Sequence, residues 1–261
     1  MELIDTHCHL TFKELFGDVE NVIKRSKEAG VTGWITVGTD TDQNRKAVEL
    51  VDEFENMYVA VGIHPHYAKD VCSDDIAELR KLAQNEKVVA IGETGLDFHY
   101  DFSRYEDQRR LFAKHLEIAA ELNLPVIVHS REAFDETMDV LQQFGRDVKK
   151  VVLHCFSYSA EQAKIVLEKD FYVSFTGVVT FRNSRTACEA AEVVPVEKLM
   201  IESDCPYMSP EPMRKQKVNE PALMIHTAAR LAELKGMDLA DFAKAVTTAS
   251  RQFFSLPIAG A

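Results

Sequence analysis

Side chains that can bind a divalent metal ion stand at the ends of several short apolar segments. The first segment, Leu3–His9, reads Leu-Ile-Asp-Thr-His-Cys-His and ends in two histidines separated by one residue. The full set of candidate ligands comprises His7, His9, Glu93, His129, His154 and Asp204. Imidazole nitrogens and carboxylate oxygens are the ligands that Zn²⁺, Mn²⁺ and similar ions take in proteins. The set therefore predicts a metal site.

Each candidate also has a simpler explanation when it is taken alone. A single histidine at a strand end is more often a hydrogen-bonded structural residue than a ligand. Glu93 alone could be a surface carboxylate, and Asp204 alone could cap a turn before Pro206. Six ligands at equivalent positions favour the metal site, and they exceed what one open catalytic ion needs. We therefore expect two divalent ions (Mg²⁺, Mn²⁺ or Zn²⁺), and a carboxylate such as Glu93 can bridge them.

Apolar segments that read as buried strands alternate with amphipathic segments that read as helices. The predicted strands are 3–9, 33–37, 57–63, 88–93, 125–129, 151–154, 171–175 and 199–201. The predicted helices are 18–29, 42–55, 73–85, 105–122, 133–144, one that begins at a capping box at 159, and then 186–193, 220–235 and 239–254. This alternation predicts an α/β protein with a parallel sheet closed as a single (β/α)8 TIM barrel over residues 1–261. An open doubly wound sheet is the alternative, but no Gly-x-Gly-x-x-Gly follows any strand.

A barrel of this kind explains why ligands that are distant in sequence recur at strand ends. Active sites of such barrels lie at the C-terminal ends of the strands, so the six candidates would converge there. Side chains alternate along a strand, so His7 and His9 face one side and Cys8 the other. The same alternation turns Cys155 away from the site. We therefore expect both cysteines to be packing residues rather than nucleophiles.

The composition limits the possible locations and partners. The 261 residues carry a net charge of −12, which argues against a protein that coats nucleic acid non-specifically but not against an enzyme that grips a strand end. The first residues lack the features of a secretory signal, and no apolar run is long enough to span a membrane. Five cysteines without framework spacing suggest reduced thiols and a cytoplasmic location.

Basic side chains gather in two predicted loops despite the acidic background. The loops after the seventh and eighth strands, which often bind phosphate in barrels, contain Arg182, Arg185, Arg214, Lys215 and Lys217. The predicted substrate-binding residues are His64, His66, Arg131, Arg182, Lys215 and Lys217. For the two histidines, the alternative is a loop fixed by the proline between them. Aromatic residues expected at the same rim could stack on bases or simply pack the loops.

Several motifs together resemble those of the TatD family. They are the segments 5–9, 62–66, 91–97, 129–133, 154–157 and 201–207, and the similarity extends to Asn219-Glu220-Pro221. The resemblance implies an amidohydrolase-like TIM barrel and a metal-dependent hydrolase, with deoxyribonuclease activity as the best-known assignment. By position, His7, His9 and Asp204 resemble the ligands of a first ion, His129 and His154 those of a second, and Glu93 the bridge.

Two positions depart from the family pattern. Ser250 stands where members often have Asn, and Val218 precedes Asn219 where many have Arg. Neither is a predicted ligand, so the departures bear on substrate binding rather than on chemistry.

The function predicted from these features is hydrolysis of phosphodiester bonds in single-stranded DNA by an exonuclease that uses metal-activated water. Asp204 is the predicted base and Glu93 the second catalytic residue, while Glu202 orients a ligand or pairs with a base such as Arg131. Hydrolysis of a small ester or amide, or deacylation of aminoacyl-tRNA, is the alternative on the same metal site. A non-catalytic binding protein is disfavoured because every expected ligand is present. We expect a monomer without an obligate protein partner.

Overall fold

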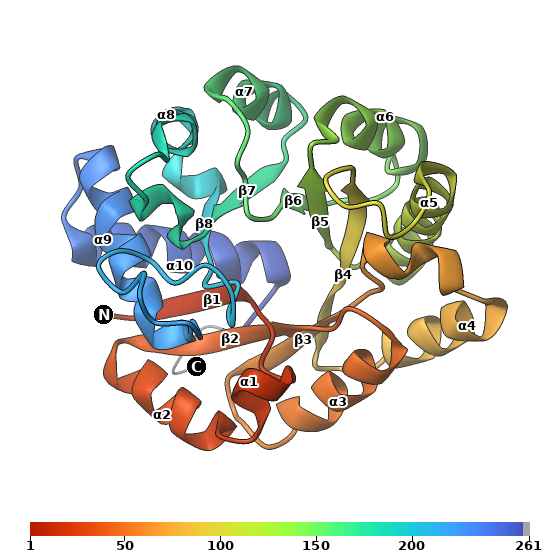
Figure 1. Ribbon diagram of the computed structural model, residues 1–261, viewed down its shortest axis with the longest axis horizontal. Helices are drawn as coiled ribbons and strands as arrows, with labels where there is room; N and C mark the ends of the chain where they lie inside the picture. Colours follow the sequence, from red (N-terminus) through yellow and green to blue (C-terminus); the bar gives the residue numbers. More distant parts are fainter. Residues whose placement is uncertain (258–261) are drawn as a thin grey trace. The chain divides into compact units, whose positions relative to one another are not determined.

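Strands and helices alternate along the chain in the computed structural model, which describes residues 1–257 (Figure 1). The strands are β1 Leu3–Cys8, β2 Val31–Val37, β3 Met57–Val61, β4 Val88–Asp97, β5 Val126–Arg131, β6 Val151–Leu153, β7 Tyr172–Phe175 and β8 Leu199–Ile201. Their order in the sheet is the order of the sequence, and the pairs β1–β2, β3–β4, β4–β5, β5–β6 and β7–β8 are parallel. The chain thus has the (β/α)8 topology predicted from the sequence.

A helix follows almost every strand, which is the connection that parallel neighbours require. The α-helices are α1 Lys13–Phe16, α2 Val19–Glu28, α3 Thr41–Val51, α4 Ser73–Leu82, α5 Tyr105–Leu122, α6 Phe134–Phe144, α7 Ala160–Glu168, α8 Arg185–Val193, α9 Met224–Lys235 and α10 Leu239–Phe254. Short 3₁₀ helices are η1 Pro65–Asp70, η2 Gly177–Thr180, η3 Val196–Lys198 and η4 Pro221–Leu223. None of the described helices is both long and apolar enough to cross a membrane.

The chain divides into two compact units. The terminal unit comprises Met1–Thr36 and the chain from Cys155 onward, and the central unit is Val37–His154. Because the terminal unit combines both ends of the chain, its strands meet from opposite ends of the sequence. The prediction of one domain over residues 1–261 stays a prediction.

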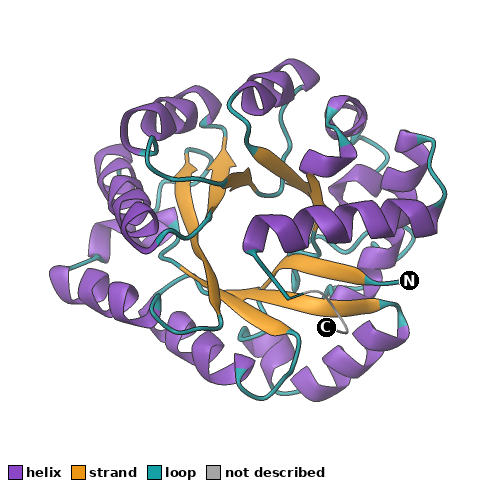
Figure 2. Cartoon of the chain, turned by 180° about the vertical axis from the view of Figure 1, so that it is seen from behind, coloured by secondary structure: helices purple, strands orange, loops and turns teal. Residues whose placement is uncertain are grey.

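In the terminal unit, β1 lies between β2 and β8. The Thr6 hydroxyl donates to the Ile201 carbonyl at 3.0 Å, and Leu3 is in register with Val31 of β2. Helix α10 packs on β1 and β8, and Figure 2 shows this long helix beside β1 near the N-terminus. The Thr247 hydroxyl of α10 donates to the Glu2 carbonyl at 2.8 Å. The N-terminal strand is therefore held by residues from the last third of the chain.

In the central unit, strands β3 to β6 form four consecutive parallel neighbours. Helix α5 covers β4, and α3 and α6 pack on β3 and β5 (Figure 1). The face of α5 that packs on the sheet includes Phe112 and Leu116, both fully buried. The strands are almost continuously apolar until their C-terminal ends, as expected where both faces of a parallel sheet are covered.

Helix boundaries follow from local capping chemistry. The predicted capping box at Ser159 is confirmed: its hydroxyl accepts from the Gln162 N–H at 3.3 Å, and the Gln162 side chain accepts from the Ser159 N–H at 3.1 Å. Helix α5 ends at Asn123 with φ of 57°, and α9 ends at Gly236 with φ of 62°, both in the left-handed conformation that closes helices. The helix expected from 220 starts only at Met224, because a 3₁₀ turn precedes it at Pro221.

Candidate metal centre

The first candidate metal-binding cluster lies in the terminal unit and consists of His7, His9 and Asp204. The two Nε2 atoms of the histidines are 3.2 Å apart, and Asp204 Oδ1 lies 3.4 Å from the Nε2 of His9 and 3.8 Å from that of His7. All three residues are buried, and one ligand atom from each lies within 4.8 Å of the others. Two imidazoles and a carboxylate at this spacing fit a single divalent ion.

Backbone contacts hold this cluster in place. The Asp204 N–H donates to the His7 carbonyl at 2.9 Å, and the His9 N–H donates to the Cys205 carbonyl at 2.9 Å. Asp204 has φ of 51°, a left-handed conformation that costs energy in most residues but that Asp tolerates. The ring of His9 stacks on Phe12 with centroids 4.6 Å apart. The end of β1 and the turn after β8 are thus fixed against each other.

Asp5 supports the same cluster, although it was not among the predicted site residues. Its carboxylate accepts from the N–H and the hydroxyl of Ser203 at 2.9 and 2.6 Å, and from the His7 N–H at 3.3 Å. Burial raises the pKa of Asp5 to about 7, while the hydrogen bonds from Ser203 act in the opposite direction. The signal in the sequence was the alternation of β1, in which Asp5 shares a side with His7.

The second cluster lies in the central unit, around Glu93. Glu93 Oε1 is 2.8 Å from His129 Nδ1, 2.7 Å from His154 Nε2 and 3.5 Å from His64 Nε2. His129 Nδ1 and His154 Nε2 are 3.3 Å apart. Burial raises the pKa of Glu93, but its histidine neighbours outweigh burial and hold that pKa well below its usual value. The cluster offers a charged carboxylate oxygen and imidazole nitrogens that face one another, which suits a divalent ion.

Two glycines allow β4 to place Glu93 beside β5. A Cβ at Gly95, where φ is +141°, would lie 2.0 Å from the His129 carbonyl oxygen. At Gly92, where φ is +153°, it would lie 2.7 Å from the Ile127 carbonyl oxygen. Only glycine fits such close approaches. Strand β4 therefore continues past its predicted end at 93 and reaches Asp97.

Asp97 is a second residue that the sequence reasoning did not assign. Its Oδ2 lies 2.9 Å from His129 Nε2 and 3.0 Å from His66 Nε2. Burial raises the pKa of Asp97, but the hydrogen bonds from the two histidines outweigh it and lower that pKa far below the usual value. The alternation of Glu93, Gly95 and Asp97 along β4 was the available signal, since all three face the same way.

His64 and His66 are less alike than their spacing suggested. His64 is buried and belongs to a group of possible metal ligands with Glu93 and His129, a role that the sequence did not assign to it. Burial lowers the pKa of His64 to about 4, although Glu93 acts in the opposite direction. His66 is partly exposed and hydrogen-bonded to Asp97. Substrate contact by either histidine stays a prediction.

The basic residues predicted to bind substrate lie on exposed positions. Arg131 ends β5, and its guanidinium lies over the ring of Tyr100 at 5.0 Å. Arg182, Lys215 and Lys217 are exposed on the loops that follow β7 and β8. These loops meet where the Arg214 guanidinium packs over the ring of Phe181 at 3.9 Å.

Glu202 and the cysteines near the ligands have structural contacts. The Glu202 carboxylate accepts from the Cys155 N–H and from the Ser174 hydroxyl, both at 2.6 Å. Cys8 is buried, and its thiol donates to the Ile35 carbonyl at 3.3 Å, as the alternation of β1 predicts. The role of Glu202 in orienting a ligand stays a prediction.

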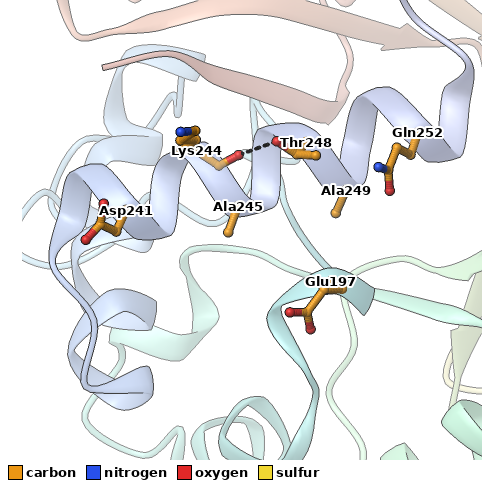
Figure 3. A pocket seen from close by; sticks show the side chains of 7 residues that line it. All are labelled: Glu197, Asp241, Lys244, Ala245, Thr248, Ala249 and Gln252. Carbon is orange, nitrogen blue, oxygen red and sulfur yellow. Dashed lines mark hydrogen bonds between the residues drawn. The ribbon is translucent and has the colours of Figure 1, made fainter.

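A separate pocket of about 350 Å³ lies on α10 (Figure 3). Asp241, Lys244 and Thr248 of α10 line it, and Glu197 faces them from η3. None of the predicted site residues, all of which lie in the described part of the chain, lines this pocket. The candidate chemistry belongs to the two clusters.

Comparison with known proteins identifies the class that this fold and these ligands define, a metal-dependent hydrolase. The sequence is 37% identical over 254 residues to "Uncharacterized metal-dependent hydrolase YabD" of Bacillus subtilis (strain 168), covering 97% of this chain and 99% of that protein. It is also 33% identical over 259 residues to "3'-5' ssDNA/RNA exonuclease TatD" of Erwinia tasmaniensis, covering 97% and 100% of the two chains.

A family model and a solved structure both assign this chain to one family. The family model described as TatD related DNase matches residues 4–255, so the chain belongs to the TatD family. The crystal structure of YJJV, a TatD homologue from Escherichia coli K12, superposes with a TM-score of 0.92 at 28% identity and covers 98% of each chain. The resemblance stated from the motifs is confirmed, and so is the fold class, an amidohydrolase-like (β/α)8 barrel.

Proposed function

We propose that this protein is a metal-dependent exonuclease that hydrolyses phosphodiester bonds of single-stranded DNA. One observation carries the proposal: two largely buried clusters, each with at least three nitrogen or oxygen ligand atoms, stand at the C-terminal ends of parallel strands. The name of the Erwinia relative, which specifies single-stranded DNA and RNA, supports a nucleic-acid substrate.

Two divalent ions are proposed, with Mg²⁺, Mn²⁺ and Zn²⁺ as the candidates. His7, His9 and Asp204 would hold one ion, and His129 and His154 with Glu93 would hold the other. When bound, such ions supply positive charge to the phosphoryl oxygens and lower the pKa of water. A bridge between the ions by Glu93 stays a prediction from the sequence.

The side chains of this protein have separate tasks in the proposed reaction. Asp204 accepts the proton of the attacking water, because a carboxylate beside two candidate ligand histidines can face an ion and still reach a water on that ion. The histidines orient the carboxylates that they contact. Burial of His7, His9 and Glu93 strengthens the charge interactions within the clusters.

Substrate binding is assigned to basic and imidazole groups on the loops that follow the strands. The proposed contacts to phosphates are His64, His66, Arg131, Arg182, Lys215 and Lys217. Arg182, Lys215 and Lys217 are exposed, and a net charge of −12 makes such local positive groups the natural binding place for a polyanion. Because these groups would bind phosphates by charge, we expect the affinity for DNA to fall as the salt concentration rises.

The test is cleavage of a labelled single-stranded oligonucleotide with Mg²⁺ or Mn²⁺, together with direct measurement of bound metal. Wild type should shorten the strand, and His129→Ala and Asp204→Asn should lower the rate by at least about 100-fold. His226→Ala on α9 and Asp241→Asn on α10 are matched controls outside both clusters and should keep the wild-type rate.

Wild-type protein that contains its ions but leaves DNA and RNA intact would refute the proposal. Cleavage of small esters, amides or aminoacyl-tRNA by the same protein would instead support the alternative function predicted from the sequence. A cytoplasmic location, a monomeric state and the absence of an obligate protein partner stay predictions.

A further inference from the structure

Asp97 has a carboxylate whose two oxygens serve two different groups. It stands at the C-terminal end of β4 and is 1% exposed. Oδ2 accepts from His129 Nε2 at 2.9 Å and from His66 Nε2 at 3.0 Å. Oδ1 accepts from the backbone N–H groups of His99 and Tyr100, both at 3.0 Å. One side chain therefore links a candidate metal ligand with the turn that leaves the strand.

The bond to Asp97 determines which nitrogen of His129 can bind a metal. His129 Nδ1 faces the second cluster, 2.8 Å from Glu93 Oε1 and 3.3 Å from His154 Nε2. An imidazole binds a metal through the nitrogen that carries no proton, and the hydrogen bond of the other nitrogen fixes this choice. An acceptor at Nε2 keeps a proton there. The proton that Nδ1 shares with Glu93 in the metal-free protein is therefore the one that an ion would displace.

The position of Asp97 is itself tightly fixed. Its N–H donates to Gln108 Oε1 at 2.8 Å, and Gln108 Nε2 donates to its carbonyl at 3.0 Å. Gln108 also donates to the Ser103 carbonyl at 2.9 Å and is 2% exposed. Because helix α5 holds the backbone of Asp97 in this way, the carboxylate is pre-oriented toward His129.

We propose that Asp97 is a positioning residue for the metal ion held by the second cluster, because it keeps His129 in the tautomer that presents Nδ1. The inference rests on the proposed role of His129 as a ligand. It adds a residue that touches neither the ion nor the substrate.

An Asp97→Asn substitution separates this role from simple packing, because the amide has nearly the same shape. Its oxygen must face the N–H groups of His99 and Tyr100, since an NH₂ group there would meet two donors. The NH₂ group then faces His129 Nε2, which must become an acceptor. The one proton of the neutral ring then stays on Nδ1, beside Glu93, and blocks the ligand position.

The experiment is a calorimetric titration of the metal-free full-length protein with Zn²⁺ and with Mn²⁺. In Asp97→Asn, we expect the affinity for one ion to fall by about 10- to 100-fold, while the ion bound by His7, His9 and Asp204 keeps its affinity. His66→Ala is the matched control, because it removes the other donor to the same oxygen and leaves the Asp97–His129 bond. It should bind both ions as wild type does.

A second measurement on the wild type keeps the inference testable even if the variant does not fold. Nitrogen-15 NMR of the Zn²⁺-loaded protein should show Nδ1 of His129 bound to the metal and a proton on Nε2. Metal bound at Nε2, or a folded Asp97→Asn protein with unchanged affinity for both ions, would overturn the inference. Neither readout depends on DNA cleavage, so failure here is distinguishable from failure of the proposed exonuclease activity.

Discussion

His115 should make the stability of this protein depend on pH between about pH 4 and 6.5, through its pKa shift. It is fully buried in α5, its Nδ1 lies 2.8 Å from the Leu111 carbonyl, and its Nε2 accepts from the Ile63 N–H at 2.9 Å. One nitrogen donates and the other accepts, so this environment suits the neutral ring. Burial lowers the pKa of His115 to about 4, although the Leu111 carbonyl acts in the opposite direction.

The size of the effect follows from the difference between folded and unfolded states. The unfolded histidine has its ordinary pKa of 6.5, so between pH 6.5 and about 4 the unfolded chain binds the proton and the folded protein does not. The free energy of unfolding therefore falls as the pH falls through this window. At about 1.4 kcal/mol per pKa unit, roughly 2.5 kcal/mol is lost by about pH 4.5.

The assay is urea unfolding of metal-free protein at about pH 7.5 and pH 4.5, for the wild type and for His115→Gln. Glutamine does not titrate, and its side-chain oxygen can still accept from the Ile63 N–H. Other titrating groups, such as Asp5 and His64, are common to both proteins and cancel in the comparison. The wild type should lose about 2.5 kcal/mol more than the variant.

Equal losses of stability in the two proteins would refute this account of His115. They would mean that its pKa in the folded protein is close to its ordinary value, and hence that water reaches the ring. A change confined to the slope of the urea transition would instead indicate an altered unfolded state.

Three further predictions concern packing and surface charge, each measured by urea unfolding at neutral pH. Gly95→Ala should destabilise the protein by more than about 3 kcal/mol, since the new methyl group meets the His129 carbonyl oxygen; wild-type stability would show that β4 can move away from β5. Phe112→Ala should lower the free energy of unfolding by about 3–5 kcal/mol, because it empties a fully buried site. A decrease below about 1 kcal/mol would contradict this expectation. Arg25→Ala should lower the free energy of unfolding by less than about 1 kcal/mol, since the Arg25 side chain that binds Glu220 is 44% exposed; a larger loss would show that this ion pair stabilises the fold.

The fold was predictable because each strand carries its own signal. Continuous apolar runs that end in a polar side chain mark buried parallel strands, and the helices between them begin and end at recognisable caps such as Ser159 and Gly236. Strand β4 shows the limit. Its second half, residues 92–97, contains two glycines and reads as a loop, yet it continues the strand because those glycines permit close contact with β5.

The candidate ligands were predictable because they stand at or near the ends of recognisable apolar strands. The groups that support them were not predictable. His129 and His154 directly follow apolar runs, so their position alone marks them. Asp97 and Asp5 act through bonds to partners 32 and 198 residues away, and sequence spacing gives no measure of such contacts. The pattern also gave no reason to separate His64 from His66, because only burial distinguishes the enclosed ring from the accessible one.

The way the first strand is secured affects how the chain can fold during its synthesis. Asp5 and His7 hydrogen-bond to Ser203 and Asp204, which the ribosome adds almost two hundred residues later. The central unit, by contrast, is one continuous stretch that can complete its own contacts as soon as His154 has emerged. The first histidines can therefore reach their partners only after the whole middle of the chain has been synthesised.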